Sequence, residues 1–348
     1  MISLCLLTNN INQVGGIERV ISTLTTYFVT IEDWEVTIIS LYSEETKTVF
    51  SIPDNVEIVH AKLKSNIKQW LRSYFTERKF DMLLTFHPYI GFEISRIRKY
   101  FPNMHWIATE HSSPYEYTWK RKVLNLLAYH RAEKLVVLTQ SAKKYYVARG
   151  IFHTDVIPNA LSFETKKRGN YTAKKIIAVG RLEEIKGFDI LIKAFAEIVS
   201  YYPEWTLNIV GSGTQEEYLQ KVVAEYHLED NICFYGASRN IKEHMLNSSF
   251  LVISSKLEGF SLVAIEALEC GLPLVSFELP SIMEITDNYK AAIFVQQRTA
   301  DTLADKMEKL IVSPELLQNM GEEAKECANN YRISKIGKQW KNLIESLI

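Results

Sequence analysis

The chain is poor in cysteine and has no long apolar run, and each absence excludes a class of protein. Its 348 residues include four scattered cysteines without a Cys-x-x-Cys pair, which argues against a disulfide scaffold or structural zinc and favours a reducing compartment. No stretch has the roughly 18 uninterrupted apolar residues of a membrane span, so any membrane contact is expected to be peripheral. The apolar start at residues 2–7 is too short for a signal peptide and predicts a buried first strand. The cysteines are Cys5, Cys233, Cys270 and Cys327.

The chain as a whole has almost no net charge, although one segment is strongly basic. The 40 Lys and Arg nearly balance the 41 Asp and Glu, and 47% of the residues are hydrophobic, which excludes a disordered or polyanion-coating protein. Residues 61–150 nevertheless contain 17 Lys and Arg against 6 Asp and Glu. This segregation predicts a face that meets an anionic partner, with a set of solvated helix surfaces as the alternative.

The length and the apolar pattern together predict two α/β domains. The chain is longer than the roughly 250–300 residues that a single hydrophobic core usually organises. Short β-rich apolar runs alternate with helical patterns, and they lack the strict alternation of strands with one exposed face. We therefore expect two doubly wound, Rossmann-like domains with parallel sheets covered on both faces. The runs are residues 2–7, 36–41, 82–86, 106–109 and 135–138 in the first half, and 176–179, 207–210, 232–235, 251–253, 274–277 and 293–295 in the second.

A polar, aperiodic segment at residues 159–175 predicts the boundary between these domains. The expected division is an N-terminal Rossmann-like domain over 1–160 and a C-terminal Rossmann-like domain over 161–330. The last segment, 331–348, has apolar residues at helical spacing and is expected to pack back toward the N-terminal domain. Because ligands bind beyond the carboxyl ends of parallel strands, we expect the two domains to face each other across a ligand-binding cleft.

Glycines follow several of the predicted strands. Gly15 and Gly16 lie between the first strand and a helical segment, where glycine permits close backbone approach and a helix N-terminus offers N–H groups to a phosphate. Gly211 and Gly213 follow a strand of the second domain in the same way. Each turn alone is equally compatible with a tight strand-to-helix connection, so the phosphate-binding interpretation depends on their combination.

Two cations follow the first strand of the second domain. Arg181 offers a forked guanidinium and Lys186 a point charge, a combination suited to adjacent phosphates. The alternative is a surface loop in which both cations pair with Glu183 and Glu184.

The most informative segment is residues 258–273. Glu258 lies in a loop after a strand, where its carboxylate can accept hydrogen bonds from sugar hydroxyls. Ser261 is expected to cap a helix that Gly271 ends, and the N-terminal residues Ser261, Leu262 and Val263 are expected to receive a diphosphate. Glu266, farther along this helix, is suited to a ribose diol, unless it is an ordinary solvent-facing residue. Together with the two cations, this segment predicts a nucleotide-sugar site.

On these motifs the chain resembles retaining glycosyltransferases of the GT-B fold, family 4, which make bacterial capsules, exopolysaccharides and lipopolysaccharide. The resemblance covers essentially the whole length, and it implies that the domain over 1–160 binds the acceptor and the domain over 161–330 the nucleotide sugar. It implies that Arg181 and Lys186 bind the donor diphosphate and stabilise its charge as it leaves, that Glu258 holds the transferred sugar, and that Glu266 holds the donor ribose. It further implies that Gly16 lets a loop close over the phosphates and that His111 lies beside the donor sugar. The motifs are residues 15–19, 109–111, 157–160, 180–188 and 210–213 and the two glutamates of the 258–266 segment.

The function that the resemblance implies is transfer of a hexosyl unit, with retention, to a lipid-linked or polysaccharide acceptor. The donor is a nucleotide-diphosphate sugar, with UDP favoured, and neither a metal nor another cofactor is expected, since the chain has no Asp-x-Asp motif. One departure is Pro280-Ser281, where the family often has a glycine pair, so the donor-loop contacts of the family are not predicted here.

The basic segment predicts a membrane-facing surface, because its cations alternate with aromatic residues as in a helix that lies on an anionic bilayer. We therefore expect a cytoplasmic protein, peripheral on the inner face of the cell membrane. Arg96, Arg98, Lys99, Lys120, Arg121 and Lys122 extend the patch. Its main residues are Lys62, Lys64, Lys68, Trp70, Arg72, Arg78 and Lys79.

Two alternative functions fit the same motifs. One is a sugar-nucleotide epimerase of the same two-domain architecture, which needs no acceptor and is distinguished by product analysis with donor alone. The other is a non-catalytic subunit that binds a nucleotide or a membrane. Nucleic-acid binding is not expected, because the basic segment contains no recognisable recognition module.

Overall fold

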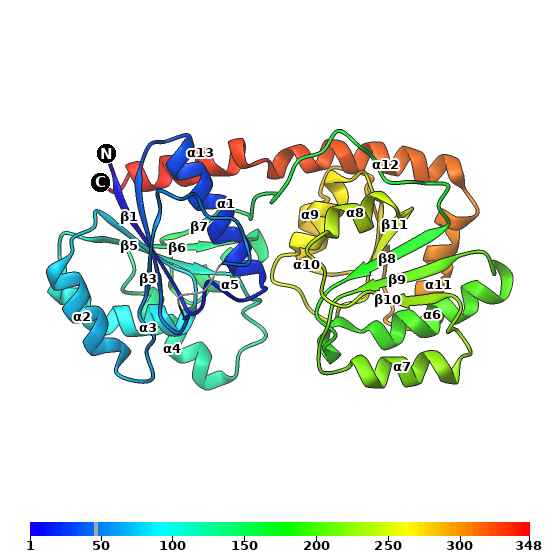
Figure 1. Cartoon of the computed structure of the whole chain (residues 1–348), viewed down its shortest axis with the longest axis horizontal. Coiled ribbons are helices and arrows are strands. Elements are labelled where there is room, and N and C mark those ends of the chain that lie inside the picture. The colour runs from blue at the N-terminus through cyan, green and yellow to red at the C-terminus, as the bar shows by residue number, and fades with distance from the viewer. Residues whose placement is uncertain (45–47) are drawn as a thin grey trace. The chain divides into compact units, whose positions relative to one another are not determined.

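The computed structural model describes residues 1–44 and 48–348 and divides into two compact α/β units. Unit 1 consists of Met1–Ser162 together with Arg332–Ile348, and unit 2 of Phe163–Tyr331. The domain limits expected from the sequence lie within two residues of these boundaries. Each unit is a parallel sheet with helices on both faces, as Figure 1 shows, and the predicted fold class is therefore confirmed.

The sheet of unit 1 has the strand order β3-β2-β1-β4-β5-β6-β7 within the described residues, and all of its pairings are parallel. In the register of the central strands, Leu4 pairs with Val36 on one side and Met82 on the other. The strands are β1 (Ser3–Thr8), β2 (Glu35–Ser40), β3 (Glu57–His60), β4 (Met82–Thr85), β5 (His105–Glu110), β6 (Lys134–Val137) and β7 (Thr154–Val156). The helices are α1 (Gly16–Thr30), α2 (Ile67–Glu77), α3 (Pro88–Ile97), α4 (Trp119–Tyr129), α5 (Gln140–Val147) and α13 (Ile333–Glu345), with a 3-10 helix at Arg98–Tyr100.

The sequence pattern missed β3 and β7, the two edge strands of this sheet. Strand β3 is exposed to half-buried along its length, and β7 has only three residues, one of them Asp155. Neither strand is an apolar run, because an edge strand buries less of its surface than a central strand.

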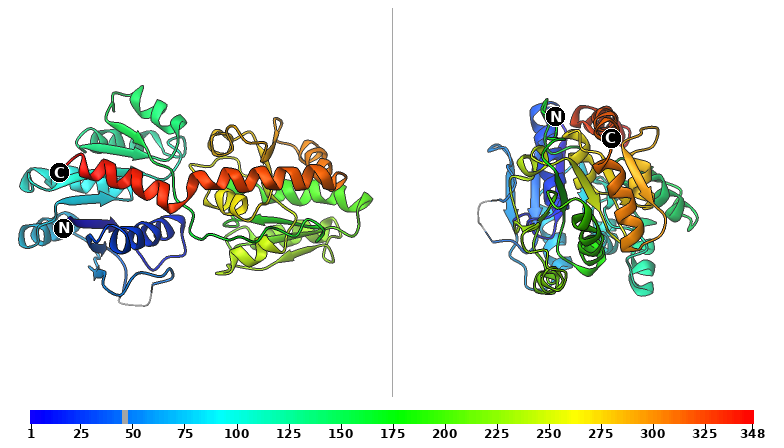
Figure 2. Two further views of the ribbon diagram at one scale, coloured as in Figure 1. Left: turned by 90° about the horizontal axis from the view of Figure 1, so that it is seen from above. Right: turned by 90° about the vertical axis from the view of Figure 1, so that its right-hand side faces the viewer.

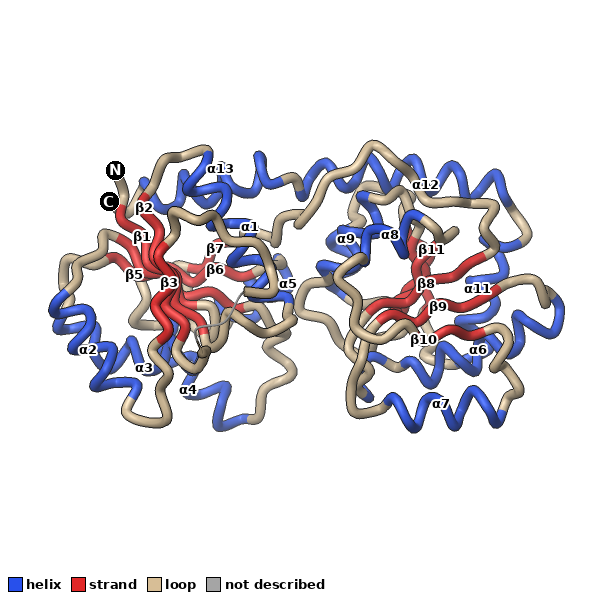
Figure 3. Tube along the Cα trace, in the orientation of Figure 1, coloured by secondary structure: helices blue, strands red, loops and turns tan. Residues whose placement is uncertain are grey.

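Helices cover the sheet of unit 1 on both faces (Figure 3). Cys5 and Leu7 of β1 belong to one core with apolar residues of α2 to α5. Successive strand residues point to opposite faces, so the buried Leu4 and Leu6 point toward the other face. Helix α1 covers that face and packs against α13.

The C-terminal helix α13 lies on α1, as the views of Figures 1 and 2 agree. Gly337 packs against the ring of Tyr27, where a Cβ atom would lie 2.6 Å from ring carbons. Lys341 pairs with Glu32, which also accepts a hydrogen bond from the Tyr27 hydroxyl at 2.7 Å. These contacts join the two ends of the chain within unit 1.

The sheet of unit 2 has the order β10-β9-β8-β11-β12-β13 within the described residues, again with parallel pairings, and each strand overlaps a predicted run. Its core combines residues of these strands with apolar faces of α6, α7, α11 and α12. The strands are β8 (Lys175–Val179), β9 (Thr206–Val210), β10 (Ile232–Phe234), β11 (Phe250–Ile253), β12 (Leu274–Phe277) and β13 (Ala292–Val295). The helices are α6 (Phe188–Tyr201), α7 (Glu216–Glu225), α8 (Ile241–Leu246), α9 (Leu262–Glu269), α10 (Pro280–Ile285), α11 (Ala300–Ile311) and α12 (Pro314–Ala328), with 3-10 helices at Glu184–Lys186 and Asn329–Tyr331.

Helix α2 corrects the membrane prediction for Trp70. The ring of Trp70 stacks on Tyr74 at a centroid distance of 4.9 Å, and both rings pack against the core of unit 1. The alternation of cations and aromatic residues therefore reflects a helix with one face in the core. Arg78 pairs with Glu57 at 2.6 Å, which offsets its charge. The outward positions are purely polar: Lys62, Lys64, Lys68, Arg72 and Lys79 are exposed.

In residues 1–44 and 48–348, no helix combines the length and the hydropathy that a membrane span requires.

Glu110 at the end of β5 is the centre of a buried polar network. Its carboxylate accepts hydrogen bonds from the hydroxyls of Tyr117 at 2.8 Å, Tyr129 at 2.8 Å and Tyr146 at 3.1 Å, and from the backbone N–H of Ser112 at 2.9 Å. Burial raises the pKa of this carboxyl, and the hydrogen bonds oppose the rise. The network fixes the loop at 111–118 and helices α4 and α5 to one strand end.

We expect Glu110→Ala to lower the free energy of unfolding by about 3 kcal/mol, because buried hydroxyls lose their acceptor. Urea denaturation measures this change. Glu116→Ala, an exposed glutamate of the same loop, is the control and should change the value by no more than about 0.5 kcal/mol. Equal effects of the two substitutions would contradict a structural role for the network.

The same network makes stability depend on pH. The folded chain holds the Glu110 proton more tightly than the unfolded chain, so this contribution is complete below the unfolded pKa and is lost as pH rises through the folded pKa. Glu110→Gln has no proton to lose. We therefore expect the difference in unfolding free energy to shift in favour of Glu110→Gln as pH rises from about 4 to about 8. A difference that does not vary with pH would show that the carboxyl titrates normally.

Candidate functional site

The strand order of unit 2 reverses between β8 and β11. Strand β8 pairs with β9 on one side and β11 on the other, so the loops that follow β8 and β11 lead away in opposite directions. Ligands of open parallel sheets bind at such a reversal, beyond the carboxyl ends of the strands. The predicted donor-site residues of unit 2 lie in these two loops and in their neighbours.

The loops after β8 and β9 are in backbone contact. Leu182 N–H donates to the Ser212 carbonyl at 2.9 Å. Gly211 has a φ of +149°, and a Cβ there would lie 1.8 Å from the Gly180 carbonyl oxygen, while a Cβ at Gly213 would lie 2.4 Å from the Leu182 carbonyl oxygen. Both glycines are therefore required by backbone packing, and their predicted contact with donor phosphate stays a prediction.

The loops after β8 and β11 are also tied together. Gly187 has a φ of +64°, and a Cβ there would lie 2.3 Å from the Ser254 carbonyl oxygen. The Ser254 hydroxyl donates to the Lys186 carbonyl at 2.9 Å, and Lys256 N–H donates to the Ile185 carbonyl at 2.8 Å. This packing fixes where the side chains of both loops lie.

Lys186 and Glu258 meet across these loops. The Lys186 Nζ lies 2.6 Å from Glu258 Oε1, and the Ser255 hydroxyl donates to the same oxygen at 2.7 Å. The lysine side chain is 21% exposed and the glutamate side chain 11%, so the pair is screened less than a surface pair and remains open to a ligand. The structure thus brings together two of the predicted catalytic residues.

The departure at Pro280-Ser281 has a structural consequence. Pro280 is at the N-terminal end of α10, a position that suits its fixed φ and missing N–H. The Ser281 hydroxyl donates to the Glu258 carbonyl at 3.1 Å. A side-chain hydrogen bond thus links the β12 loop to the glutamate loop, a role that the sequence did not indicate for Ser281.

The two glutamates beside the cations have other partners. Glu184 pairs with Lys256 at 2.8 Å, and Glu183 accepts hydrogen bonds from the hydroxyl and N–H of Thr214 at 2.7 and 3.3 Å. Those hydrogen bonds, more than the charge of the exposed Arg181, lower the pKa of Glu183. The alternative in which Lys186 pairs with a neighbouring glutamate is therefore wrong.

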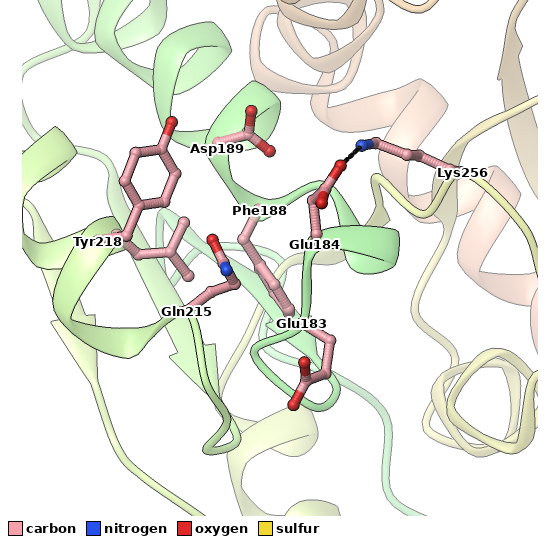
Figure 4. A pocket seen from close by; sticks show the side chains of 8 residues that line it. Glu183, Glu184, Phe188, Asp189, Gln215, Tyr218 and Lys256 are labelled. Atoms are coloured by element: carbon pink, nitrogen blue, oxygen red, sulfur yellow. Dashed lines mark hydrogen bonds and ion pairs between the residues drawn. The ribbon is translucent and has the colours of Figure 1, made fainter.

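A cavity of about 290 Å³ lies beside this loop, between α6 and α7 (Figure 4). Three carboxylates line it, and Glu184 reaches from the loop toward Lys256. A diphosphate would meet mostly like charge there, so this cavity is a poor donor site. Its lining residues are Glu183, Glu184, Phe188, Asp189, Gln215, Tyr218, Leu219 and Lys256.

Helix α9 begins and ends as the sequence predicts. The Ser261 hydroxyl accepts a hydrogen bond from Ala264 N–H at 3.2 Å, and Gly271 follows the helix with a φ of +67°. Leu262 and Val263 are its first residues, so their N–H groups lie at its N-terminus. Glu266 is fully buried, and the solvent-facing alternative for this residue is therefore wrong.

In unit 1, the predicted glycine turn lies at the start of α1. Gly15 is the N-cap residue, with extended backbone, and Gly16 is the first helical residue. A Cβ at Gly15 would lie 2.3 Å from a carboxylate oxygen of Glu18, whose pKa is raised by burial. Phosphate binding at Gly15 and Gly16 stays a prediction.

His111 is held in place by its neighbours. Its ring stacks on Phe86 at 5.5 Å, and Nε2 lies 2.9 Å from the Thr109 hydroxyl. Burial, with a smaller contribution from the charge of His87, lowers the pKa of His111 to about 3, and burial lowers that of His87 to about 4. Both rings are therefore neutral at pH 7.

A second cavity, of about 400 Å³, lies in unit 1 where its strand order reverses between β1 and β4. Asn9 follows β1 and His87 follows β4, and the His87 Nε2 lies 3.3 Å from the Thr8 hydroxyl. Asn9 and His87 were not predicted as site residues from the sequence, although polar residues that closely follow two strands were a usable signal. The lining residues are Asn9, His87, Pro88, Tyr89, Phe92, Ser112, Tyr117, Arg121, Leu124 and Asn125.

Among the candidate residues, the structure brings Lys186 and Glu258 into direct contact, and a cleft between the two units stays a prediction. Within the part of the chain that the structure describes, no group of three or more His, Cys, Asp or Glu side chains is arranged to hold a metal ion.

Comparison with known proteins shows similarities over the second half of the chain and over its whole length. Residues 162–327 match the family model described as Glycosyl transferases group 1. An uncharacterized glycosyltransferase of Haemophilus influenzae is 29% identical over 352 residues, which cover 96% of this chain and 98% of that protein. The amylovoran biosynthesis glycosyltransferase AmsD of Erwinia amylovora is 26% identical, with 99% of this chain and all of AmsD covered.

A solved structure has the same fold over nearly the whole chain. Anabaena Alr3699/HepE, crystallised in complex with UDP and glucose, matches with a TM-score of 0.82 at 18% identity, over 99% of this chain and 100% of that one. The chain thus has the GT-B fold of two Rossmann-like units, and its residues 162–327 are similar to the family described as Glycosyl transferases group 1.

Proposed function

We propose that this chain is a retaining glycosyltransferase of bacterial surface glycan synthesis. It transfers a hexosyl unit from a nucleotide-diphosphate sugar to a polysaccharide or lipid-linked acceptor. The observation that carries the proposal is the Lys186–Glu258 contact at the strand reversal of unit 2. The names of two similar proteins support it: AmsD acts in amylovoran biosynthesis, and HepE was crystallised with UDP and glucose. UDP is therefore the favoured donor nucleotide.

The ion pair explains how the site is kept ready for a donor. Without ligand, Lys186 and Glu258 neutralise each other, which limits the cost of holding either charge half-buried. When the donor binds, its diphosphate takes over Lys186 and its sugar hydroxyls donate to Glu258. Lys186 then exchanges a carboxylate partner for the diphosphate, and Glu258 exchanges an ammonium partner for neutral hydroxyls.

The charge of the leaving diphosphate is stabilised by this chain's own groups. Arg181 is exposed at the carboxyl end of β8 and contributes a second cation, and the N–H groups at the start of α9 contribute positive potential. Groups fixed in place before reaction stabilise developing charge without reorganising. No step in this scheme needs a metal ion or another cofactor.

The cavity of unit 1 is the proposed acceptor site. Tyr89, Phe92 and Tyr117 offer aromatic surface for the apolar faces of a saccharide, and Asn9 and the neutral His87 offer hydrogen bonds. Arg121 adds a single cation for an anionic part of the acceptor. His111 keeps its assignment beside the donor sugar, with its ring held in place by Phe86 and the Thr109 hydroxyl.

A thermal-shift screen tests the donor class. UDP at about 100 times its dissociation constant should stabilise the folded chain by about 2.7 kcal/mol and raise the melting temperature. GDP and ADP at the same concentration should raise it less. If no nucleotide diphosphate shifts the transition at millimolar concentration, the proposed function is wrong.

Single substitutions test the two cations. Lys186→Ala and Arg181→Ala should each lower turnover by about 10² or more, the scale expected for loss of one preorganised charge-stabilising group. Lys256→Ala is the matched control, because Lys256 also pairs with a glutamate beside this loop but lies on the cavity that we do not assign to the donor. Near-normal turnover in both cation variants would refute their role.

The two glutamates should have separable effects. Glu258→Gln should lower kcat with little change in nucleotide affinity, because this side chain is assigned to the transferred sugar. Glu266→Gln should weaken UDP binding, because this side chain is assigned to the ribose. Steady-state kinetics and UDP titration measure the two quantities. A loss of thermal stability alone, in both variants, would show that the residues are structural.

A further inference from the structure

Helix α4 of unit 1 exposes an apolar stripe. Trp119, Val123 and Leu127 are 71%, 49% and 48% exposed, and their spacing of four residues places them on one side of the helix. The opposite side buries Asn125, Ala128 and Tyr129. An α-helix that packs on one face normally presents polar residues on the other, so this second apolar face is unusual.

The stripe is part of a larger exposed patch. Tyr115, just before the helix, is 62% exposed, and Leu124 is 40% exposed. Single exposed apolar residues need no explanation, but a contiguous group of this size marks an interaction surface. The α4 surface consists of Trp119, Lys120, Lys122, Val123, Leu124 and Leu127, and the ring of the preceding Tyr115 packs against Tyr145.

Cations accompany this apolar patch. Lys120, Arg121 and Lys122 follow Trp119 directly, and α4 contains no Asp or Glu. The Lys120 ammonium lies 5.7 Å from the centre of the Trp119 ring. A partner for this surface must therefore accept both apolar side chains and positive charge.

Helix α2 lacks the exposed apolar residues that α4 has. Its aromatic residues Trp70 and Tyr74 pack against the core, which leaves only polar side chains outside. An apolar surface can enter a bilayer, whereas a purely charged one is held only by screened attraction.

We propose that the α4 surface docks this chain on an anionic lipid bilayer. The apolar stripe enters the boundary between headgroups and acyl chains, and Lys120 and Lys122 contact lipid phosphates. Charge complementarity favours this occupant over a second copy of the chain, since two α4 surfaces would bring like charges together.

The docking surface adjoins the proposed acceptor cavity. Arg121 and Leu124 of the same helix line that cavity, so docking through α4 places the cavity close to the lipid headgroups. A saccharide attached to a membrane lipid through phosphate would then reach the cavity without leaving the bilayer. This part of the inference rests on the proposed function, whereas docking itself does not.

Vesicle co-sedimentation tests the docking surface. The full chain should bind phosphatidylcholine vesicles that contain phosphatidylglycerol and bind poorly to phosphatidylcholine alone. The triple variant Trp119→Ser, Val123→Ser, Leu127→Ser should lower the partition coefficient at least about tenfold. Lys120→Gln with Lys122→Gln should lower it by about twentyfold at low salt.

A matched control removes the same charge from α2. Lys64→Gln with Lys68→Gln changes two exposed lysines of the same unit and should keep most of the binding. Loss of binding in this control but not in the α4 variants would overturn the assignment, as would equal recovery of the wild type with both vesicle types. A dimer in sedimentation velocity that the triple variant converts to a monomer would also overturn it, in favour of a second copy.

The thermal shift with UDP, measured on the same variants, distinguishes the docking proposal from the proposed function. None of the substituted residues lies in the donor site, so we expect the wild-type shift in each variant. Vesicle binding without a UDP shift would refute the proposed function and leave docking in place. A UDP shift without vesicle binding would refute docking alone.

Discussion

The reversal of strand order next to β8 is the constraint on which the candidate site depends. Two adjacent parallel strands end at the same edge of the sheet, and the segments that follow them diverge. In unit 2 the loops after β8 and β11 meet where Gly187 packs directly on the Ser254 carbonyl. Without that close packing, Lys186 and Glu258 would lie on separate loops with no fixed distance between them. The same arrangement recurs in unit 1, where Asn9 and His87 follow β1 and β4 and line a cavity.

The ionisable side chains have different surroundings in the two units. In unit 2, a half-buried lysine and glutamate neutralise each other in a position open to a ligand, which suits groups that exchange partners during a reaction. In unit 1, Glu110 is buried and surrounded by tyrosine hydroxyls, and the nearby histidines are held neutral by burial. The first arrangement suits the charged donor of the proposed function. The second keeps the surroundings of the unit 1 cavity rigid, with Arg121 as the cation that lines it.

Helix α4 connects the chemistry of unit 1 to its surface. Residues on three of its sides have different surroundings. Tyr129 donates a hydrogen bond to Glu110, Arg121 and Leu124 line the cavity, and Trp119 is exposed. Since a short helix must satisfy all three, its sequence contains more apolar residues than burial alone requires.

The sequence by itself determined the fold class, because central parallel strands are buried on both faces and appear as apolar runs, and only the edge strands β3 and β7 escaped detection. It also determined local features such as the Ser261 cap and the Gly271 helix end, since these depend on residues a few positions apart. The tertiary structure alone decided that Trp70 points inward, that Lys186 pairs with Glu258 rather than with a neighbouring glutamate, and that Ser281 bonds to the glutamate loop. Each of these is a contact between segments distant along the chain, and spacing within one segment carries no information about which distant segment packs beside it.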